Sequence, residues 1–367
     1  MIQFSKYQGL GNDFIILEGR RGQLTDARAN PDTDWVRRIC DRRFGVGADG
    51  VILALPAQAE ADLCMRIFNA DGTEAEMCGN GIRCLARYLT DSDGEAPGRI
   101  WSIETLAGMI RPELMEDGQL RVDMGPPFLE PETIPTTLML DGGLPQGTLL
   151  LEGDQLKVAA VGMGNPHVVV PVDDLQTIPF DAWGAALETH PVFPAKTNVH
   201  FLQVLDRSHL QIRVWERGAG PTLACGTGAC ATLVAAVLLG LSEQRAEVML
   251  PGGPLFIEWN DRKGSVLMTG PAEAVFDGVL TPELGGGGAG SVQPMASPEQ
   301  SPVQQPTFDC ARDCADQCQR PQNCLRDEAQ QKVQAFLNST SLDSMLNLAS
   351  ESLEQRTRAR FERGGGL

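Results

Sequence analysis

The segments Met65-Arg-Ile-Phe-Asn69 and Cys78-Gly-Asn-Gly81 decide how this chain folds, because the chain contains them twice. The second copy reads Ile212-Arg-Val-Trp-Glu216 and Cys225-Gly-Thr-Gly228, and both of its parts lie 147 residues after the first copy. In each copy the cysteine follows the end of the first segment by nine residues, so the copies align without a gap. Self-similarity of this kind is typical of an internally duplicated fold.

A second match lies upstream of the first. Gly9-Leu-Gly-Asn12 precedes Phe14-Ile-Ile-Leu17, and Gly162-Met-Gly-Asn165 precedes His167-Val-Val-Val170, at a displacement of 153 residues. This displacement is larger than the 147 residues of the first match, which requires only a small insertion between the two matched regions. Two matches in the same order predict two homologous halves, each of which presents one cysteine in the same local setting.

The pattern of apolar residues predicts halves of mixed secondary structure. Short β-branched or alternating segments predict strands at residues 14–17, 51–55, 65–68, 118–124, 168–172, 199–205, 210–215 and 265–270. Each Cys-Gly-Xaa-Gly segment is followed by a predicted helix, over 82–89 and over 229–239. The second helix is apolar almost all round, which predicts that it lies buried at the centre of its half.

A break in composition separates the body of the chain from its last part. Residues 285–305 begin with four glycines and continue rich in Pro, Ser and Gln, which predicts a flexible linker. The body is expected to divide into residues 1–125, with Cys78, and residues 126–284, with Cys225. We expect the last strand of the second half to return to the first half. Residues 306–367 form a separate cysteine-containing tail.

Charge and hydropathy limit the classes of partner. A net charge of −18 argues against nucleic acid and against an anionic membrane surface, since both would repel the protein. Hydrophobic residues make up 42% of the chain, which is ample for packed cores, yet no apolar run approaches the roughly 20 residues of a membrane span. No signal or transit segment precedes the first glycine-rich motif, so a cytoplasmic location is expected.

Cys78 and Cys225 are the candidate catalytic residues. At the start of a helix, unpaired backbone N–H groups and the helix dipole favour negative charge, which lowers the pKa of a thiol and can hold a substrate carboxylate. Two such helix starts facing each other would place one sulfur on each side of the Cα of a bound amino acid. A thiolate on one face then removes the Cα proton and a thiol on the other face returns one, without a cofactor or a metal ion.

The four other cysteines of the body lack this setting and are expected to be core residues. They are Cys40, Cys64, Cys84 and Cys230.

Seven motifs in order resemble those of the diaminopimelate epimerase family, over residues 1 to about 282. They are Gly9-Leu-Gly-Asn-Asp-Phe14, Phe44-Gly-Val-Gly-Ala-Asp-Gly50, Phe68-Asn-Ala-Asp-Gly72, Met77-Cys-Gly-Asn-Gly-Ile-Arg-Cys84, Gly164-Asn-Pro-His167, Thr197-Asn-Val199, and Trp215-Glu-Arg-Gly218 with Ala224-Cys-Gly-Thr-Gly228. The resemblance implies an α+β fold of two pseudo-symmetric domains, each a β-sheet wrapped around a central helix, with the site between them. It also implies interconversion of LL- and meso-diaminopimelate in lysine biosynthesis, no cofactor, and a homodimer.

Matched to the family residue by residue, the resemblance implies an acid/base pair and a binding set. Cys78 and Cys225 would exchange protons with the substrate, and His167 and Glu216 would tune them. The residues that would bind substrate are Asn12, Asn69, Gly79, Asn80, Asn165, Asn198, Glu216, Arg217, Gly226 and Thr227. The sequence departs from the pattern at Gly50, where some members have a substrate-binding Gln.

Two other readings of the body stay open on sequence alone. A proline racemase or hydroxyproline epimerase would use the same scaffold. The substrate of such an enzyme has no distal amino-acid group that Asn69, Glu216 and Arg217 could bind. A thiol-based binding or redox protein is the alternative from another class, although no Cys-Xaa-Xaa-Cys motif is present. A cysteine hydrolase is disfavoured, because such an enzyme would not explain why the duplicated fold presents a second, equivalent cysteine.

The tail carries its own cysteine pattern. Cys310, Cys314 and Cys318 recur every four residues and would line one face of a helix, and Cys324 follows a helix-breaking segment. Three cysteines on consecutive helical turns span about 12 Å, too far for one tetrahedral ion, so a redox-sensitive or helix-hairpin arrangement competes with metal binding. Residues 342–363 predict an amphipathic helix with a basic end, which suits either docking to a partner or exposure to solvent.

Overall fold

The computed structural model describes residues 2–22, 24, 29–151, 153–260 and 264–285. The linker from residue 286 onward and the tail lie outside the described residues, and so do the predictions made for Cys310, Cys314, Cys318 and Cys324. Within the described part of the chain, no helix has the length and apolar character that crossing a membrane requires.

The first sheet is built mainly from the N-terminal third of the chain. Its strand order is β20-β1-β2-β3-β4-β6-β7, and β5 pairs with β4. The strands span Gln3–Gly9 (β1), Asn12–Glu18 (β2), Gly50–Leu55 (β3), Leu63–Asn69 (β4), Glu74–Ala75 (β5), Ile103–Thr105 (β6), Gly108–Ile110 (β7) and Glu273–Val279 (β20).

The second sheet is the larger of the two. Its strand order is β10-β11-β12-β13-β14-β15-β17-β18-β19-β9-β8, and β16 pairs with β15. The strands span Pro112–Leu114 (β8), Leu120–Asp123 (β9), Met139–Asp141 (β10), Leu144–Leu151 (β11), Asp154–Gly162 (β12), Pro166–Pro171 (β13), Asn198–Asp206 (β14), His209–Glu216 (β15), Gly220–Thr222 (β16), Arg245–Leu250 (β17), Gly253–Glu258 (β18) and Leu267–Gly270 (β19).

The two sheets repeat one pattern of strand pairing. From β1 to β7 the neighbouring pairs alternate antiparallel, parallel, antiparallel, parallel and antiparallel. The pairs from β12 through β13, β14, β15 and β17 to β18 follow the same sequence of directions. Even the short flanking strands correspond, since β5 pairs with β4 as β16 pairs with β15. The duplication predicted from the sequence is therefore confirmed in the topology.

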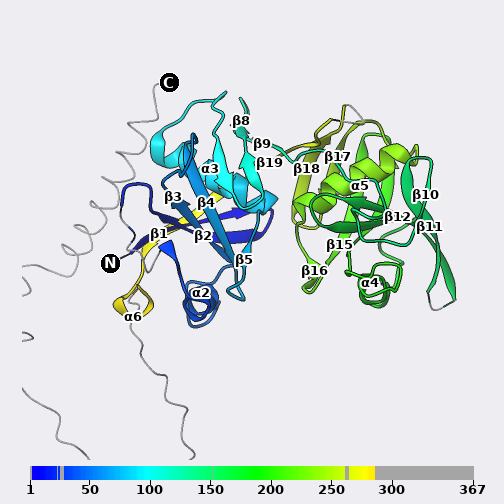
Figure 1. Ribbon diagram of the computed structural model, residues 1–367, viewed down its shortest axis with the longest axis horizontal. Helices are drawn as coiled ribbons and strands as arrows, with labels where there is room; N and C mark the ends of the chain where they lie inside the picture. Colours follow the sequence, from blue (N-terminus) through cyan, green and yellow to red (C-terminus); the bar gives the residue numbers. More distant parts are fainter. Residues whose placement is uncertain (1, 23, 25–28, 152, 261–263, 286–367) are drawn as a thin grey trace, which may run out of the picture. The chain divides into compact units, whose positions relative to one another are not determined.

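Each sheet packs against one central helix. The helix α3 (Gly79–Asp93) contacts β1, β2 and β3, and α5 (Gly226–Leu238) contacts β12, β13 and β14. Figure 1 labels both central helices. From Gly228 to Ala236 every residue of α5 is buried, because this helix carries apolar side chains on all its faces. Both helices start earlier than predicted, at the first residue after the cysteine. A left-handed Gly94 ends α3 and donates its N–H to Thr90.

The opposite faces of the sheets carry shorter helices. The helix α2 (Thr33–Cys40) lies in a core with strand residues of the first sheet, and α4 (Phe180–Glu188) lies in a separate core on the second sheet. A third core holds the apolar side chains of both α3 and α5. The remaining helix, α6 (Pro282–Gly285), follows β20. The α+β architecture of two sheets around central helices agrees with the predicted fold class.

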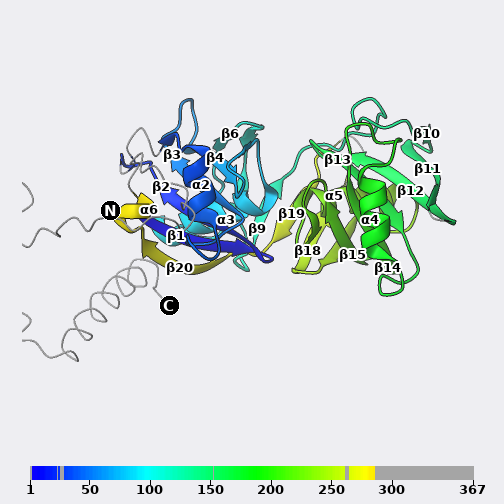
Figure 2. The same ribbon diagram turned by 90° about the horizontal axis from the view of Figure 1, so that it is seen from below.

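Strand exchange links the two ends of the body. The strand β20 comes from the end of the body but pairs antiparallel with β1, and Figure 2 shows the yellow β20 beside the blue β1. In the other direction, β8 and β9 precede residue 125 but join the second sheet through β19. These two strands contact α3. The helix of the first half is thus enclosed by strands of both sheets.

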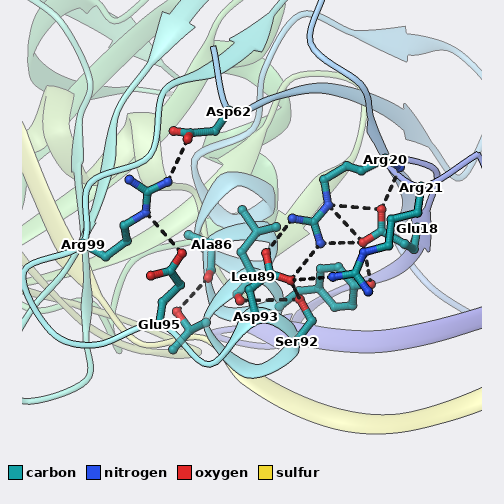
Figure 3. A network of polar contacts seen from close by, with 12 residues as sticks. Glu18, Arg20, Arg21, Asp62, Ala86, Leu89, Ser92, Asp93, Glu95 and Arg99 are labelled. Carbon is teal, nitrogen blue, oxygen red and sulfur yellow. Dashed lines mark hydrogen bonds and ion pairs between the residues drawn. The ribbon is translucent and has the colours of Figure 1, made fainter. Parts of the chain in front are cut away.

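The C-terminal end of α3 is held by ion pairs. Arg20 contacts both Glu18 at the end of β2 and Asp93 at the end of α3, with N–O distances of 2.6 Å, as Figure 3 shows. Arg99 pairs with Asp62 at 2.7 Å in the same region. The two contacts of Arg20 fix one end of the helix to the first sheet, and the opposite end carries the candidate catalytic cysteine.

Candidate active site

The two candidate cysteines occupy equivalent helix positions. Cys78 is the N-cap residue of α3 and Cys225 is the N-cap residue of α5, and both have extended backbone. Neither side chain makes a helix-capping hydrogen bond. Cys225 is buried and Cys78 is half-buried, and both are free thiols.

The starts of the two helices lie against each other. A Cβ added to Gly79 would lie 3.8 Å from the Cα of Gly226, the equivalent residue of the other helix. The side-chain nitrogen of Asn80 donates to the backbone oxygen of Ala224, 3.4 Å away. Met268 lies beside both glycines. The family resemblance implied that the two halves meet at the site, and these contacts show which residues meet there.

On the Cys78 side, Asn12 is the nearest predicted residue. Its side-chain oxygen accepts from the amide of Asn80 at 3.1 Å and lies 3.9 Å from the sulfur of Cys78. Its nitrogen donates to the carboxylate of Asp49 at 2.8 Å, and Arg42 holds that carboxylate from the other side at 2.7 Å. Because Asp49 can only accept, it fixes which end of the Asn12 amide faces the thiol.

On the Cys225 side, Glu216 and Thr227 are the neighbours. The sulfur of Cys225 lies 3.6 Å from the hydroxyl of Thr227, and its thiol hydrogen-bonds with Glu216. Thr222 donates to the Glu216 carboxylate at 2.6 Å. Burial raises the pKa of Glu216, which makes this carboxylate a better proton acceptor than an exposed one.

The protonation of the two thiols differs from the expectation. A position at a helix N-terminus was expected to lower their pKa values, but burial raises the pKa of Cys78 and raises that of Cys225 well above its ordinary value. Backbone N–H groups of Asn80 and Gly81 act on Cys78 in the expected direction, and Gly228 does so on Cys225. Their effect is smaller than the cost of placing a thiolate in a dehydrated site, so both residues rest as thiols.

His167 is fully buried and belongs to a chain of hydrogen bonds. Its Nε2 contacts the side-chain oxygen of Asn165 at 2.7 Å, and its Nδ1 contacts Nε2 of His200 at 2.9 Å. Since Asn165 presents an oxygen, His167 carries its proton on Nε2 and accepts from His200 on Nδ1. Burial and the neighbouring His200 hold the pKa of His167 well below its ordinary value, so the imidazole is neutral.

His167, His200 and Cys225 also gather donor atoms that could bind a metal. One ring nitrogen of each histidine and the sulfur lie within 4.8 Å of one another, and zinc accepts such ligands. Both nitrogens of His167 already take part in hydrogen bonds, so an ion would have to displace them. That the site works without a metal stays a prediction.

Two of the residues expected to bind the distal part of a substrate lie at one cavity, whereas Asn69 and Glu216 do not line it. Asn165 and Arg217 line a cavity of about 350 Å³, together with Phe128, Thr133 and Pro135. The guanidinium of Arg217 is exposed and donates to the backbone oxygen of Ala195 at 3.1 Å. A guanidinium that lines a cavity can bind a carboxylate there.

Three predicted binding residues are used within the protein. Asn198 donates to Pro166 at 2.9 Å and accepts from the backbone N–H of Arg217 at 3.0 Å, so it positions Arg217. Asn80 contributes its backbone to the helix start, while its side chain bonds Asn12 and Ala224. Asn69 is exposed at the end of β4, and its amide bonds Thr73 at 3.0 Å.

The position of Gly50 has no room for the Gln side chain that some members of the family carry there. A Cβ at this position would lie 2.5 Å from the backbone oxygen of Phe68. A Gln would require the backbone of β3 or β4 to move. The substrate contact made by that Gln is thus absent from this site.

Sequence reasoning missed Asp49, Arg83, His200 and Thr222, all of which contact predicted site residues. Asp49 and Arg83 stand inside motifs that were recognised, and a charged residue in an apolar helix is itself a signal. His200 follows the Thr197-Asn-Val199 motif directly, and nothing in the sequence marks Thr222.

Solved structures of low sequence identity share the fold. A probable proline racemase from Agrobacterium radiobacter K84 superposes with a TM-score of 0.56 at 17% identity, covering 78% of this chain and 96% of the other. A hydroxyproline epimerase from Agrobacterium vitis gives 0.55 at 17% identity, covering 76% and 90%. These likenesses show that the chain shares its fold with these two proteins, with one cysteine at the N-cap position of each central helix.

Sequence comparisons narrow the class to one family. The family model described as diaminopimelate epimerase matches residues 4–129 and 159–275. A diaminopimelate epimerase from Prochlorococcus marinus (strain MIT 9313) is 66% identical over 285 residues, covering 77% of this chain and 94% of the relative. One from Synechococcus elongatus (strain ATCC 33912 / PCC 7942 / FACHB-805) is 54% identical over 280 residues, covering 76% and 98%. The chain belongs to the diaminopimelate epimerase family and is an amino-acid epimerase.

Proposed function

We propose that this enzyme interconverts LL- and meso-diaminopimelate by proton transfer at one Cα between Cys78 and Cys225. The observation that carries the proposal is the contact between the starts of α3 and α5, each of which is capped by one of the two cysteines. Family membership and the high identity to proteins named diaminopimelate epimerase support this substrate over proline or hydroxyproline.

The reaction needs one thiolate and one thiol. The thiolate removes the Cα proton from one face of the substrate and becomes a thiol, while the opposite thiol gives its proton to the other face and becomes a thiolate. Since both thiols rest protonated, one must first lose its proton when substrate binds. Glu216, which is hydrogen-bonded to Cys225 and has a raised pKa, is the acceptor that we assign to that proton.

The reacting carboxylate is assigned to the space before the two helix starts. The N–H groups of the first turns of α3 and α5 have no intrahelical acceptors, and glycine at Gly79 and Gly226 permits a close approach. The same donors would stabilise the negative charge that spreads onto the carboxylate when the Cα proton leaves.

The distal amino-acid group is assigned to the cavity lined by Asn165 and Arg217. A guanidinium with free donors suits a second carboxylate, and side-chain amides suit a second ammonium. Proline offers neither group, which favours a substrate with two amino-acid ends.

We further propose that the enzyme acts in the cytoplasm as a homodimer, as the family resemblance implies. A net charge of −18 supports action without nucleic acid or membrane partners, because both would repel the protein. Light scattering of the purified chain measures the mass directly, and a mass of one chain would contradict the dimer.

Incubation of the reduced protein with LL-diaminopimelate in deuterated water tests the function. We expect meso product with deuterium at the inverted Cα, and none from Cys78→Ala or Cys225→Ala. Because the reaction needs both sulfurs, each variant should lose at least about 1,000-fold in rate. Cys64→Ala, a substitution outside the site, is the control. Turnover of proline derivatives in place of diaminopimelate would contradict the proposal.

A further inference from the structure

Arg83 is a charged residue in the interior of the protein. It lies on α3, one helical turn after Gly79, and its side chain is completely buried. Its nitrogens donate to the backbone oxygens of Gly79 at 3.2 Å and Pro271 at 3.3 Å, and to the side-chain oxygen of Asn80 at 2.9 Å. A fourth contact joins it to the sulfur of Met268 at 3.4 Å. All of these partners are neutral.

The absence of an anion distinguishes Arg83 from Arg20. Arg20 follows β2, contacts the far end of α3, is half-buried and pairs with two carboxylates (Figure 3). Among the residues that the structure describes, no carboxylate pairs with Arg83. A guanidinium stays protonated in proteins, so an uncompensated positive charge is buried here. Charges in that situation are costly unless an anion accompanies them.

The position of Arg83 relates it to both catalytic cysteines. It follows Cys78 on α3, and it bonds Met268, which lies against Gly79 at the start of one helix and Gly226 at the start of the other. The equivalent residue of the second half, 147 positions later, is the neutral Cys230. The buried cation is therefore present in the first half and has no counterpart at the equivalent position of the second half. Through Met268 it is linked to the starts of both helices.

We propose that Arg83 is the electrostatic positioning residue of the active site, whose buried positive charge stabilises the negative charge that a Cys78 thiolate and the substrate carboxylate bring to the helix starts. The anion that Arg83 lacks in the free enzyme is thus supplied during the reaction. The inference rests on the proposed function for the identity of the carboxylate, but its effect on the thiol requires no substrate.

The groups that act on Cys78 oppose one another. Burial and the carboxylate of Glu216 on β15 raise its pKa, and Arg83 lowers it together with the N–H groups of Asn80 and Gly81. The titratable groups around Arg83 itself are the thiols Cys78 and Cys84 on α3 and Cys230 on α5. Removing the guanidinium should leave the other influences in place and raise the pKa of Cys78 further.

Three substitutions separate charge from hydrogen bonding. Arg83→Lys keeps the charge with fewer donors, Arg83→Gln keeps donors without the charge, and Arg83→Met keeps only the length of the side chain. The rate of alkylation of Cys78 by iodoacetamide is measured against pH on the native proteins, and the modified peptide is quantified by mass spectrometry. Circular dichroism shows whether each variant is folded.

The proposal predicts an order of variants. With Gln and Met, alkylation of Cys78 at a fixed pH should slow by at least about tenfold, which is one pKa unit, whereas Lys should stay close to the wild type. Exchange of the substrate Cα proton should follow the same order, with a larger loss in kcat than in KM. Equal pH profiles for Lys, Gln and Met, or a profile in which Gln surpasses Lys, would overturn the proposal.

A second pair of variants tests the charge without removing it. Cys230→Asp gives Arg83 a buried carboxylate partner, and Cys230→Asn is the uncharged control of similar size. Alkylation of Cys78 should slow in the Asp variant relative to the Asn variant, and equal rates would contradict the inference even if the neutral variants of Arg83 do not fold. Failure of the wild type to exchange a Cα proton would contradict the proposed function, while unchanged thiol profiles would contradict the role of Arg83.

Discussion

Asn12 and Asn165 occupy equivalent places in the two halves, yet their amides are turned in opposite senses. Asp49 accepts from the nitrogen of Asn12, so the oxygen of Asn12 faces Cys78. His167 donates to the oxygen of Asn165, so this oxygen faces the ring of His167. The oxygen of Asn12 is therefore directed to a candidate catalytic residue and that of Asn165 to the ring of His167.

The buried histidines predict a loss of stability in acid. Burial lowers the pKa of His200 to about 3, against 6.5 in an unfolded chain, so the folded protein holds it neutral. Its contribution to stability is complete above pH 6.5 and is lost as the pH falls toward 3, by about 1.4 kcal/mol per pH unit. His200→Gln should remove this share of the pH dependence when the free energy of unfolding is measured by urea titration from pH 6.5 to 4.

His190→Gln, outside the site, is the control for this experiment and should keep the wild-type slope. His167 has a lowered pKa as well, so the His200 variant should retain part of the acid sensitivity. Parallel curves for His200→Gln and the wild type would contradict the assignment of His200 as a neutral buried group.

At the scale of secondary-structure elements, the first turn of α5 depends on the absence of a side chain. A Cβ at Gly228 would lie 2.1 Å from the ring of His200, which is fully buried beneath the helix. The imidazole can therefore pack directly against the helix backbone near Cys225. This contact explains a glycine at the third position of the helix, where its φ is ordinary and backbone freedom is not required.

Gly228→Ala should destabilise the protein by about 1–3 kcal/mol, because the ring or the helix must move to relieve the overlap. The free energy of unfolding and the rate of Cα exchange should both fall. Gly147→Ala on β11, where an added Cβ meets only Leu138 at 3.3 Å, is the matched control and should have a small effect. A fully stable and active Gly228→Ala would show that His200 is not packed as described.

At the scale of the whole molecule, the body is closed by strand exchange between its ends. Leu280 donates its N–H to Ile2, directly after β20 has paired with β1. The first sheet thus needs residues from the end of the body. The matched relatives are covered over 94% and 98% of their own lengths by 285 and 280 aligned residues, so the family fold ends near this point.

Two truncations test where the folding unit ends. A chain ending at Gly288 keeps β1 through β20 and should retain the melting temperature and the exchange rate of the full chain. A chain ending at Gly270 loses β20 and exposes the edge of β1, and it should lose cooperative thermal unfolding. Loss of activity in the longer truncation would show that residues 289–367 contribute to catalysis.

The sequence by itself determined the duplication, the α+β class and the strands and helices next to the motifs. These features are local, because periodicity and the repeated Cys-Gly-Xaa-Gly segments depend on neighbouring residues. The return of the last strand to the first half was expected, and β20 pairs with β1, whereas the hairpin of β11 and β12 was not predicted. The structure brings Cys78 and Cys225 together as the motif resemblance implied, whereas their roles in proton transfer stay predictions.

The tertiary structure alone decided the chemistry of those cysteines. A helix N-terminus predicts a lowered thiol pKa, yet burial raises it, because dehydration of a thiolate outweighs the nearby N–H groups. Burial is a property of the assembled core and has no local signal in the sequence. The same reason applies to Arg83 and His200, whose neutral surroundings exist only after both halves have packed around them.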